Sequence, residues 1–163
     1  MTNKTVFTKD LANNKMHVTR EFTAPLEKVW AAWTEKDLIE KWIAPKPWRA
    51  ESKSYSFTEG GTWLYAMVSP EGEKHWSRYE FKDIVPKQSY KQTSKFSDEQ
   101  GNVPEGYAGM LWTIQFFPSE IGTRVEVELY VEDSAALEKL LTMGFEGGFT
   151  MGLGNLDELL AEG

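Results

Sequence analysis

The amino-acid sequence predicts an α+β fold, in which one curved antiparallel sheet of about six or seven strands wraps around a long C-terminal helix. Apolar and polar residues alternate at 15–22 and again between 48 and 130, as they do in half-buried strands. Two short helical patterns follow the first strand, and a longer one closes the chain. A sheet and a helix that each carry one apolar face bury those faces against each other.

The strand predictions depend on period-two patterns bounded by turn residues. The stretch KMHVTREF places Met16, Val18 and Phe22 on one face of the first strand. TRVEVELYV, near the end of the series, alternates apolar and charged residues in the same way. The strands that follow the first are predicted at 48–57, 62–68, 75–85, 89–96, 110–117 and 123–131.

Two short helices are predicted between the first and second strands. In PLEKVWAAW, Leu26, Val29, Trp30 and Trp33 recur at helical spacing, and Pro25 suits a first helical turn. TEKDLIEKW repeats the pattern. The prolines of APKPW then disfavour helix in the residues before them and predict an extended loop.

The C-terminal helical pattern contains glycines that a helix normally avoids, namely Gly144, Gly147, Gly148, Gly152 and Gly154. Each interior glycine costs roughly 1 kcal/mol relative to alanine. Three of them form a row beside an apolar stripe that we expect to face the sheet, and that stripe consists of Phe145, Phe149, Leu153, Leu156 and Leu160. The row either brings the helix backbone close to the sheet or leaves a groove, and we favour the groove.

Large side chains of the predicted strands oppose this row. The residues expected on that wall are Trp63, Tyr65, Met67, Tyr79, Phe81, Tyr90, Phe96, Met110, Trp112, Ile114 and Phe116. Such a wall suits an apolar or aromatic guest, to which Tyr and Trp offer a few polar contacts. The alternative interpretation is that these rings fill the core and leave no cavity.

Composition narrows the classes of function. The formal net charge of −7 and the absence of any long run of Lys and Arg argue against a nucleic-acid partner. With no cysteine in the chain, disulfides and thiolate sites are excluded. We expect a cytoplasmic protein because the sequence shows neither a secretory signal nor an apolar stretch long enough to span a membrane. A length of 163 residues predicts one domain over 1–163, with its core at about 15–160.

HVTREFTAPLEKVWAAWTEKDLIEKWIAPKPW and three later segments carry the motifs of one known family, so that the chain, over about residues 15 to 160, resembles the family of heat-shock-protein-90 ATPase activator homologues. The residues that match the family's opening motif are Arg20, Phe22, Ala24, Pro25, Val29, Trp30, Ala32, Trp33, Thr34, Trp42 and Pro45. EGGTWLYAM, FKDIVP and GFEGGFTMGLGNLDELL resemble three further motifs in the family's order. The sequence departs from the pattern at Ile43, where a second tryptophan is common, and at Ser77 to Tyr79, which lacks the usual glycine.

This resemblance implies the helix-grip fold of the START-like (SRPBCC) superfamily, in which a curved sheet grips a C-terminal helix over an apolar cavity. It does not imply chaperone activation, because the named activator has a further N-terminal domain that is absent here. A chaperone partner is therefore possible but unsupported. The superfamily includes cyclases and hydrolases, so the resemblance leaves enzymatic use of the cavity open.

Few residues suggest catalysis. His17 and His75 are far apart in the sequence and are expected on the surface, and they form no zinc motif. Asp83 and Tyr79 are four residues apart and therefore belong to the same face of a regular strand. Asp83 points inward as a partly buried acid if the strand is regular, or outward if the strand bulges before Pro86. We expect Arg20 to form a structural ion pair near the sheet. We predict no catalytic residue, metal or cofactor.

The favoured hypothesis is a protein that binds a small apolar or aromatic molecule, or a lipid, between the last helix and the sheet. The alternatives are an enzyme that uses the same cavity and a co-chaperone-like module with an apolar patch on the outer face of the sheet. The chain is expected to be a monomer or a homodimer. The residues predicted to bind the ligand are Trp42, Trp63, Tyr65, Met67, His75, Tyr79, Phe81, Tyr90, Trp112, Phe145, Gly148, Phe149 and Gly152.

Overall fold

The computed structural model describes residues 5–44, 47–103, 109–131, 134–142 and 144–162 of the chain. Their strands form one antiparallel sheet in the order β1-β2-β8-β7-β6-β5-β4-β3. The strands are β1 (Val6–Asp10), β2 (Lys15–Phe22), β3 (Arg49–Tyr55), β4 (Thr62–Val68), β5 (Lys74–Val85), β6 (Ser89–Phe96), β7 (Met110–Pro118) and β8 (Thr123–Val131). A 3-10 turn, η1 (Leu11–Asn13), joins the first two strands.

The sheet confirms the predicted α+β class, but it has eight strands and not six or seven. The additional strand is β1, which pairs with β2 at the edge of the sheet. Four of its five residues are exposed and Phe7 alone is half-buried. Because one apolar contact produces no alternation, VFTKD has no period-two pattern that could reveal it.

The helices are α1 (Leu26–Thr34), α2 (Lys36–Ile39), α3 (Ser134–Thr142) and α4 (Phe145–Glu162). The two short helices after the first predicted strand are confirmed as α1 and α2. The long C-terminal helix is confirmed as α4, and the segment before it forms a separate helix, α3. Gly144 lies between them with φ of 87°, and its N–H donates to the carbonyl of Leu141 at 3.1 Å. A glycine in the left-handed region ends a helix without the steric cost that other residues would incur there.

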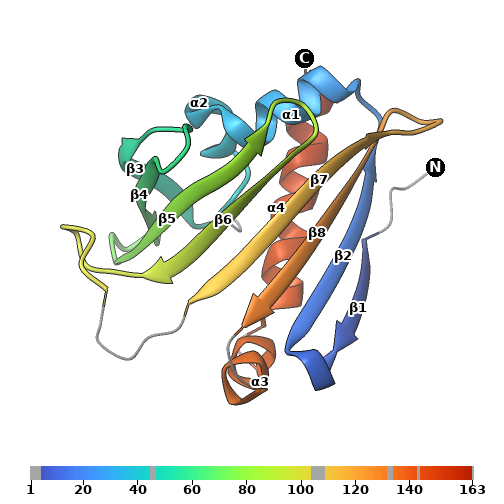
Figure 1. The fold of residues 1–163 in the computed structure, drawn as a ribbon. Coiled ribbons are helices and arrows are strands. Elements are labelled where there is room, and N and C mark those ends of the chain that lie inside the picture. The colour runs from blue at the N-terminus through green and yellow to red at the C-terminus, as the bar shows by residue number, and fades with distance from the viewer. Residues whose placement is uncertain (1–4, 45–46, 104–108, 132–133, 143, 163) are drawn as a thin grey trace.

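Helix α4 runs along one face of the sheet, with α1 near its C-terminal end and α3 near its N-terminal end (Figure 1). Its apolar stripe faces the sheet as predicted. Phe149, Leu153, Leu156 and Leu160 are buried, and Phe145 is half-buried. The alternating apolar residues of β8 complete the opposite side of this core.

Polar contacts fix the position of α4 against the rest of the molecule. The amide of Asn155 donates to the carbonyl oxygens of Ala44 at 3.2 Å and of Trp42 at 3.4 Å. Arg20, which is buried on β2, forms a bidentate ion pair with Asp157, with an Nη1–Oδ1 distance of 3.1 Å. The predicted ion pair of Arg20 is therefore confirmed, and its partner belongs to the last helix.

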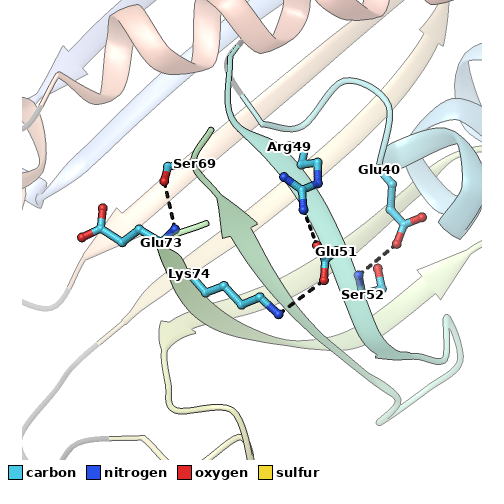
Figure 2. Close-up of polar contacts among 7 residues, drawn as sticks. All are labelled: Glu40, Arg49, Glu51, Ser52, Ser69, Glu73 and Lys74. Atoms are coloured by element: carbon cyan, nitrogen blue, oxygen red, sulfur yellow. Dashed lines mark hydrogen bonds and ion pairs between the residues drawn. The ribbon is translucent and has the colours of Figure 1, made fainter. Parts of the chain in front are cut away.

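Strand β3 forms the far edge of the sheet, and Figure 2 shows how polar side chains hold it there. A carboxylate oxygen of Glu40, which follows α2, accepts from the backbone N–H of Ser52 at 3.1 Å, beside an irregularity in the β3–β4 register. Glu51 contacts Arg49 at 2.8 Å and Lys74 of β5 at 3.5 Å. Charged side chains of this kind discourage an edge strand from pairing with another chain.

Candidate ligand-binding site

A pocket of about 240 Å³ lies between the N-terminal half of α4 and strands β4 to β7. Apart from Lys95, the strand residues of the lining share one face of the sheet, and α4 contributes residues of its first two turns. The lining consists of Ile43, Tyr65, Met67, His75, Ser77, Tyr79, Ser94, Lys95, Phe96, Met110, Trp112, Phe145, Gly148 and Phe149.

Aromatic rings form the wall where the helix meets the sheet. The ring of Trp112 packs edge-on against Phe145 and Phe149, with centroid distances of 6.0 and 5.8 Å. The two phenylalanine rings stack on each other at 5.5 Å. On the sheet, Tyr65 stacks on Trp63 at 4.0 Å. These contacts hold the rings in place, so that the apolar wall is largely preformed.

The glycine row of α4 has two different surroundings. A Cβ atom added at Gly148 would meet nothing within 4 Å outside its own helix, because this glycine faces the pocket. A Cβ atom at Gly152, one turn later, would lie 3.2 Å from the carbonyl oxygen of Trp42. Gly148 therefore leaves space beside the sheet, whereas Gly152 permits the helix backbone to approach the segment after α2, and not the sheet as the alternative interpretation predicted.

Hydroxyl groups interrupt the apolar lining at two places. The hydroxyls of Tyr65 and Tyr79 are 3.2 Å apart and hydrogen-bond to each other. The indole N–H of Trp112 donates to the hydroxyl of Ser94 at 2.8 Å. Burial raises the pKa of Tyr65 well above its usual value and also raises the pKa of Tyr79, so both hydroxyls keep their protons at neutral pH.

The pocket brings together many of the residues predicted to bind a ligand. Those that line it are Tyr65, Met67, His75, Tyr79, Trp112, Phe145, Gly148 and Phe149. Trp42 lies outside the lining, with its ring against Trp33 and its N–H donating to the carbonyl of Ala32. Gly152 lies against the Trp42 backbone, and Trp63, which is also outside the lining, stacks on the ring of Tyr65.

Phe81 and Tyr90 also lie outside the lining, in a second aromatic cluster. The ring of Phe57 packs against both, with centroid distances of 4.9 and 5.0 Å, and Trp30 of α1 contacts Tyr90 at 5.9 Å. Strand parity places these residues on the correct face of the sheet. It does not show which end of the strand they occupy, because that depends on how the sheet curves around α4.

The remaining lining residues were not among those predicted to bind the ligand, although Phe96 and Met110 were expected on the wall. They are Ile43, Ser77, Ser94, Lys95, Phe96 and Met110. A signal for Ser94 was present, because it alternates with Tyr90 and Gln92 on one face of its predicted strand. The register places it directly opposite Tyr79 on one neighbouring strand and Met110 on the other. A search restricted to large apolar residues misses such a serine.

Three residues considered for catalysis, namely Asp83, His75 and His17, lie at the surface. Asp83 has φ of 52° within a register irregularity of β5, and its side chain is 65% exposed. This is the outward, bulged alternative of the two that the sequence left open. His75 lines the pocket mouth but is 57% exposed and lies 3.4 Å from Glu73. His17 lies on β2 beside Glu126 at 3.2 Å.

The described residues contain neither a metal-binding cluster nor a membrane-spanning helix. Within the ranges that the structure describes, no three or more His, Asp or Glu side chains gather as a metal-binding group would require. The helices in these ranges are also too short or too polar to cross a membrane. On the outer face of the sheet, Glu126 pairs with Arg124 at 2.9 Å, and Glu128 pairs with Lys15 at 3.7 Å.

Comparison with known proteins agrees with this architecture. Residues 23–161 match the family described as "Activator of Hsp90 ATPase homolog 1-like protein". A crystal structure of a Mycobacterium smegmatis protein is similar with a TM-score of 0.89 at 24% identity, covering 98% of this chain and 99% of that chain. A solution structure of an Arthrobacter aurescens protein has a TM-score of 0.89 at 27% identity, with 97% and 92% covered.

A third similar structure is that of the AHSA1 protein from Silicibacter pomeroyi, with a TM-score of 0.73 at 21% identity, covering 90% of this chain and 97% of that chain. Together these similarities show that the fold is the helix-grip fold, in which a curved antiparallel sheet packs around a C-terminal helix. A comparison with curated proteins gives no significant match.

Proposed function

The chain belongs to the family of Activator of Hsp90 ATPase homolog 1-like proteins, and on this premise we propose that it binds a small apolar or aromatic molecule between α4 and the sheet. Membership of this family supports a ligand-binding domain in general. The observation that carries the finer proposal is the pocket of about 240 Å³ at Gly148, with aromatic rings on both sides.

The size of the pocket favours a compact guest over a long acyl chain. An engineered protein cavity of roughly 150 Å³ accommodates benzene, and pockets for drug-sized molecules begin near roughly 300 Å³. A pocket of about 240 Å³ lies between these limits. We therefore expect a guest of one or two rings, whose apolar surface replaces water against Trp112, Phe145 and Phe149.

A ligand screen tests this proposal. One- and two-ring aromatic compounds and long-chain fatty acids are added to the protein, and its melting temperature and tryptophan fluorescence are recorded. Compact aromatic compounds should raise the melting temperature, because a ligand that binds the native state stabilises it by about 2.7 kcal/mol at a hundred times its Kd. They should also change the emission of Trp112, which lines the pocket. If no compound changes either signal, the proposal is contradicted.

A further inference from the structure

The hydroxyl groups in the pocket carry more hydrogen-bond donors than their protein contacts use. Each tyrosine hydroxyl carries one hydrogen, so the bond between Tyr65 and Tyr79 uses one hydrogen and leaves the other. Ser94 accepts from Trp112 and keeps its own hydrogen for donation. Among the residues that the structure describes, neither hydrogen has a protein acceptor.

These donors are buried in the lining of an apolar pocket. Tyr65 is 1% exposed, Tyr79 7% and Ser94 5%, and all three line the pocket. Tyr79 and Ser94 are directly opposite each other on β5 and β6, so both donors belong to the same part of the sheet. A buried donor without an acceptor costs free energy that a suitable partner recovers.

We propose that the ligand of this pocket carries a hydrogen-bond acceptor oxygen, such as a carbonyl, which accepts the free hydrogen of the Tyr65–Tyr79 hydroxyl pair. The inference rests on the proposed function, since it specifies the chemistry of a guest in the same pocket. The apolar part of that guest contacts the rings of Trp112, Phe145 and Phe149. A guest without the oxygen leaves the donor unpaired or displaces a water that had satisfied it, and both outcomes weaken binding.

The donors favour a neutral acceptor over the other polar groups a ligand could carry. An N–H of the ligand would find hydroxyl oxygens but would leave both spare hydrogens without an acceptor. A carboxylate is costly to bury unless a cation pairs with it. Tyrosine and serine carry no positive charge. Of the lining residues that can carry one, Lys95 alternates with Ser94 and so belongs to the opposite face of β6, and His75 is 57% exposed. A carbonyl or ether oxygen therefore meets the requirement at the lowest desolvation cost.

Matched pairs of probes test the inference. Benzophenone is compared with diphenylmethane, and 1-indanone with indane, because each pair differs only in a carbonyl in place of a methylene. Their affinities are measured by isothermal titration calorimetry for the native protein and for the double variant Tyr65→Phe/Tyr79→Phe. That variant replaces both partners of a buried hydrogen bond by apolar rings of the same shape, so it should keep its stability, which circular dichroism checks. Tyr55→Phe is the control, because Tyr55 donates to the carbonyl of Thr34 outside the lining.

The ketone of a pair should bind the native protein about tenfold more tightly than its methylene partner, as one well-made hydrogen bond provides. The double variant should lose most of this preference, and Tyr55→Phe should keep it. Equal binding of ketone and methylene overturns the inference but leaves the proposed function standing. A preference that survives in the double variant overturns the assignment to the tyrosine pair. Failure of all four compounds to bind contradicts the inference and the proposed function together.

Discussion

Gly148 and Gly152 lie one turn apart on α4 and serve different purposes. At Gly148 the missing side chain leaves pocket space, whereas at Gly152 it allows the helix to approach the Trp42 carbonyl. The same residue type in the same row therefore has two roles, and the space at Gly148 agrees with the groove that the sequence analysis favoured. Gly144 has a third role, because its positive φ ends α3.

Alanine substitutions should separate these roles by the sign of their effect on stability. Gly148→Ala should raise the free energy of unfolding by up to about 1 kcal/mol, because a helix interior prefers alanine and the added Cβ meets no neighbour. Gly144→Ala should lower it by about 1–2 kcal/mol, because alanine is strained at a φ of 87°. Urea unfolding of the two variants measures both effects, and a shift of the same sign in both would refute this assignment.

The environment of a single residue could be predicted where the alternation of its own strand decides whether its side chain faces the core. The buried side of β2 and the ion pair of Arg20 followed from strand parity alone. That Phe81 and Tyr90 bind the ligand stays a prediction. In the structure both rings pack against Phe57, outside the lining of the pocket. Their parity is correct, but the distance from the pocket along each strand is set by the curvature and register of the whole sheet.

At the scale of elements, most helices and strands could be predicted because they bury one regular face. The predicted strand 123–131 has the bounds of β8. The two short helices predicted in PLEKVWAAW and TEKDLIEKW are α1 and α2, which meet at Glu35. The failures have physical causes. β1 is exposed at the edge and has no pattern, and the break between α3 and α4 depends on a single left-handed glycine among several.

The arrangement of α4 explains why the pocket lies at one end only. In its C-terminal half, Asn155, Asp157 and Leu160 contact the segment after α2, strand β2 and helix α1. In its N-terminal half, the helix contributes phenylalanines and Gly148 to the pocket. The tightly bound half fixes the helix position and the other half leaves space beside the sheet.

For the whole molecule, four buried or half-buried tyrosines make stability depend on alkaline pH. Burial raises the pKa of Tyr55, Tyr65, Tyr79 and Tyr90 above the ordinary value of 10.0. In the unfolded chain these groups lose their protons near pH 10, while in the native protein they keep them. The unfolded state therefore binds fewer protons above pH 10, and stability must fall as the pH rises beyond that value.

This decline should be measurable by urea unfolding between pH 8 and pH 11. Stability should be nearly constant up to about pH 9 and then fall, by at most about 1.4 kcal/mol per pH unit for each tyrosine. The variant Tyr65→Phe/Tyr79→Phe should show a shallower decline than the native protein, since it lacks two of the groups. Parallel declines in both proteins would show that these two tyrosines do not contribute.

The molecule as a whole presents charged pairs on the outer face of its sheet and aromatic rings on the inner face. The large apolar residues that are exposed are distributed over β1, β5, β6, β8, α4 and the turns. Among the described residues, the charged pairs of Glu126 with Arg124 and of Glu128 with Lys15 lie on the outer face, which argues against the co-chaperone alternative. The inner face, with space at Gly148, favours the binding of a small molecule.

The central claim is that the space beside Gly148 is where a ligand binds, and filling that space tests it most directly. Gly148→Leu adds four heavy atoms that point into the pocket, while Gly147→Leu adds the same atoms at an exposed neighbouring position with no contact within 4 Å. Both changes favour the helix equally. The affinity of the tightest-binding aromatic compound from the screen is then measured by calorimetry. Gly148→Leu should weaken binding at least about tenfold and Gly147→Leu should leave it unchanged; equal affinity in the two variants would contradict the account.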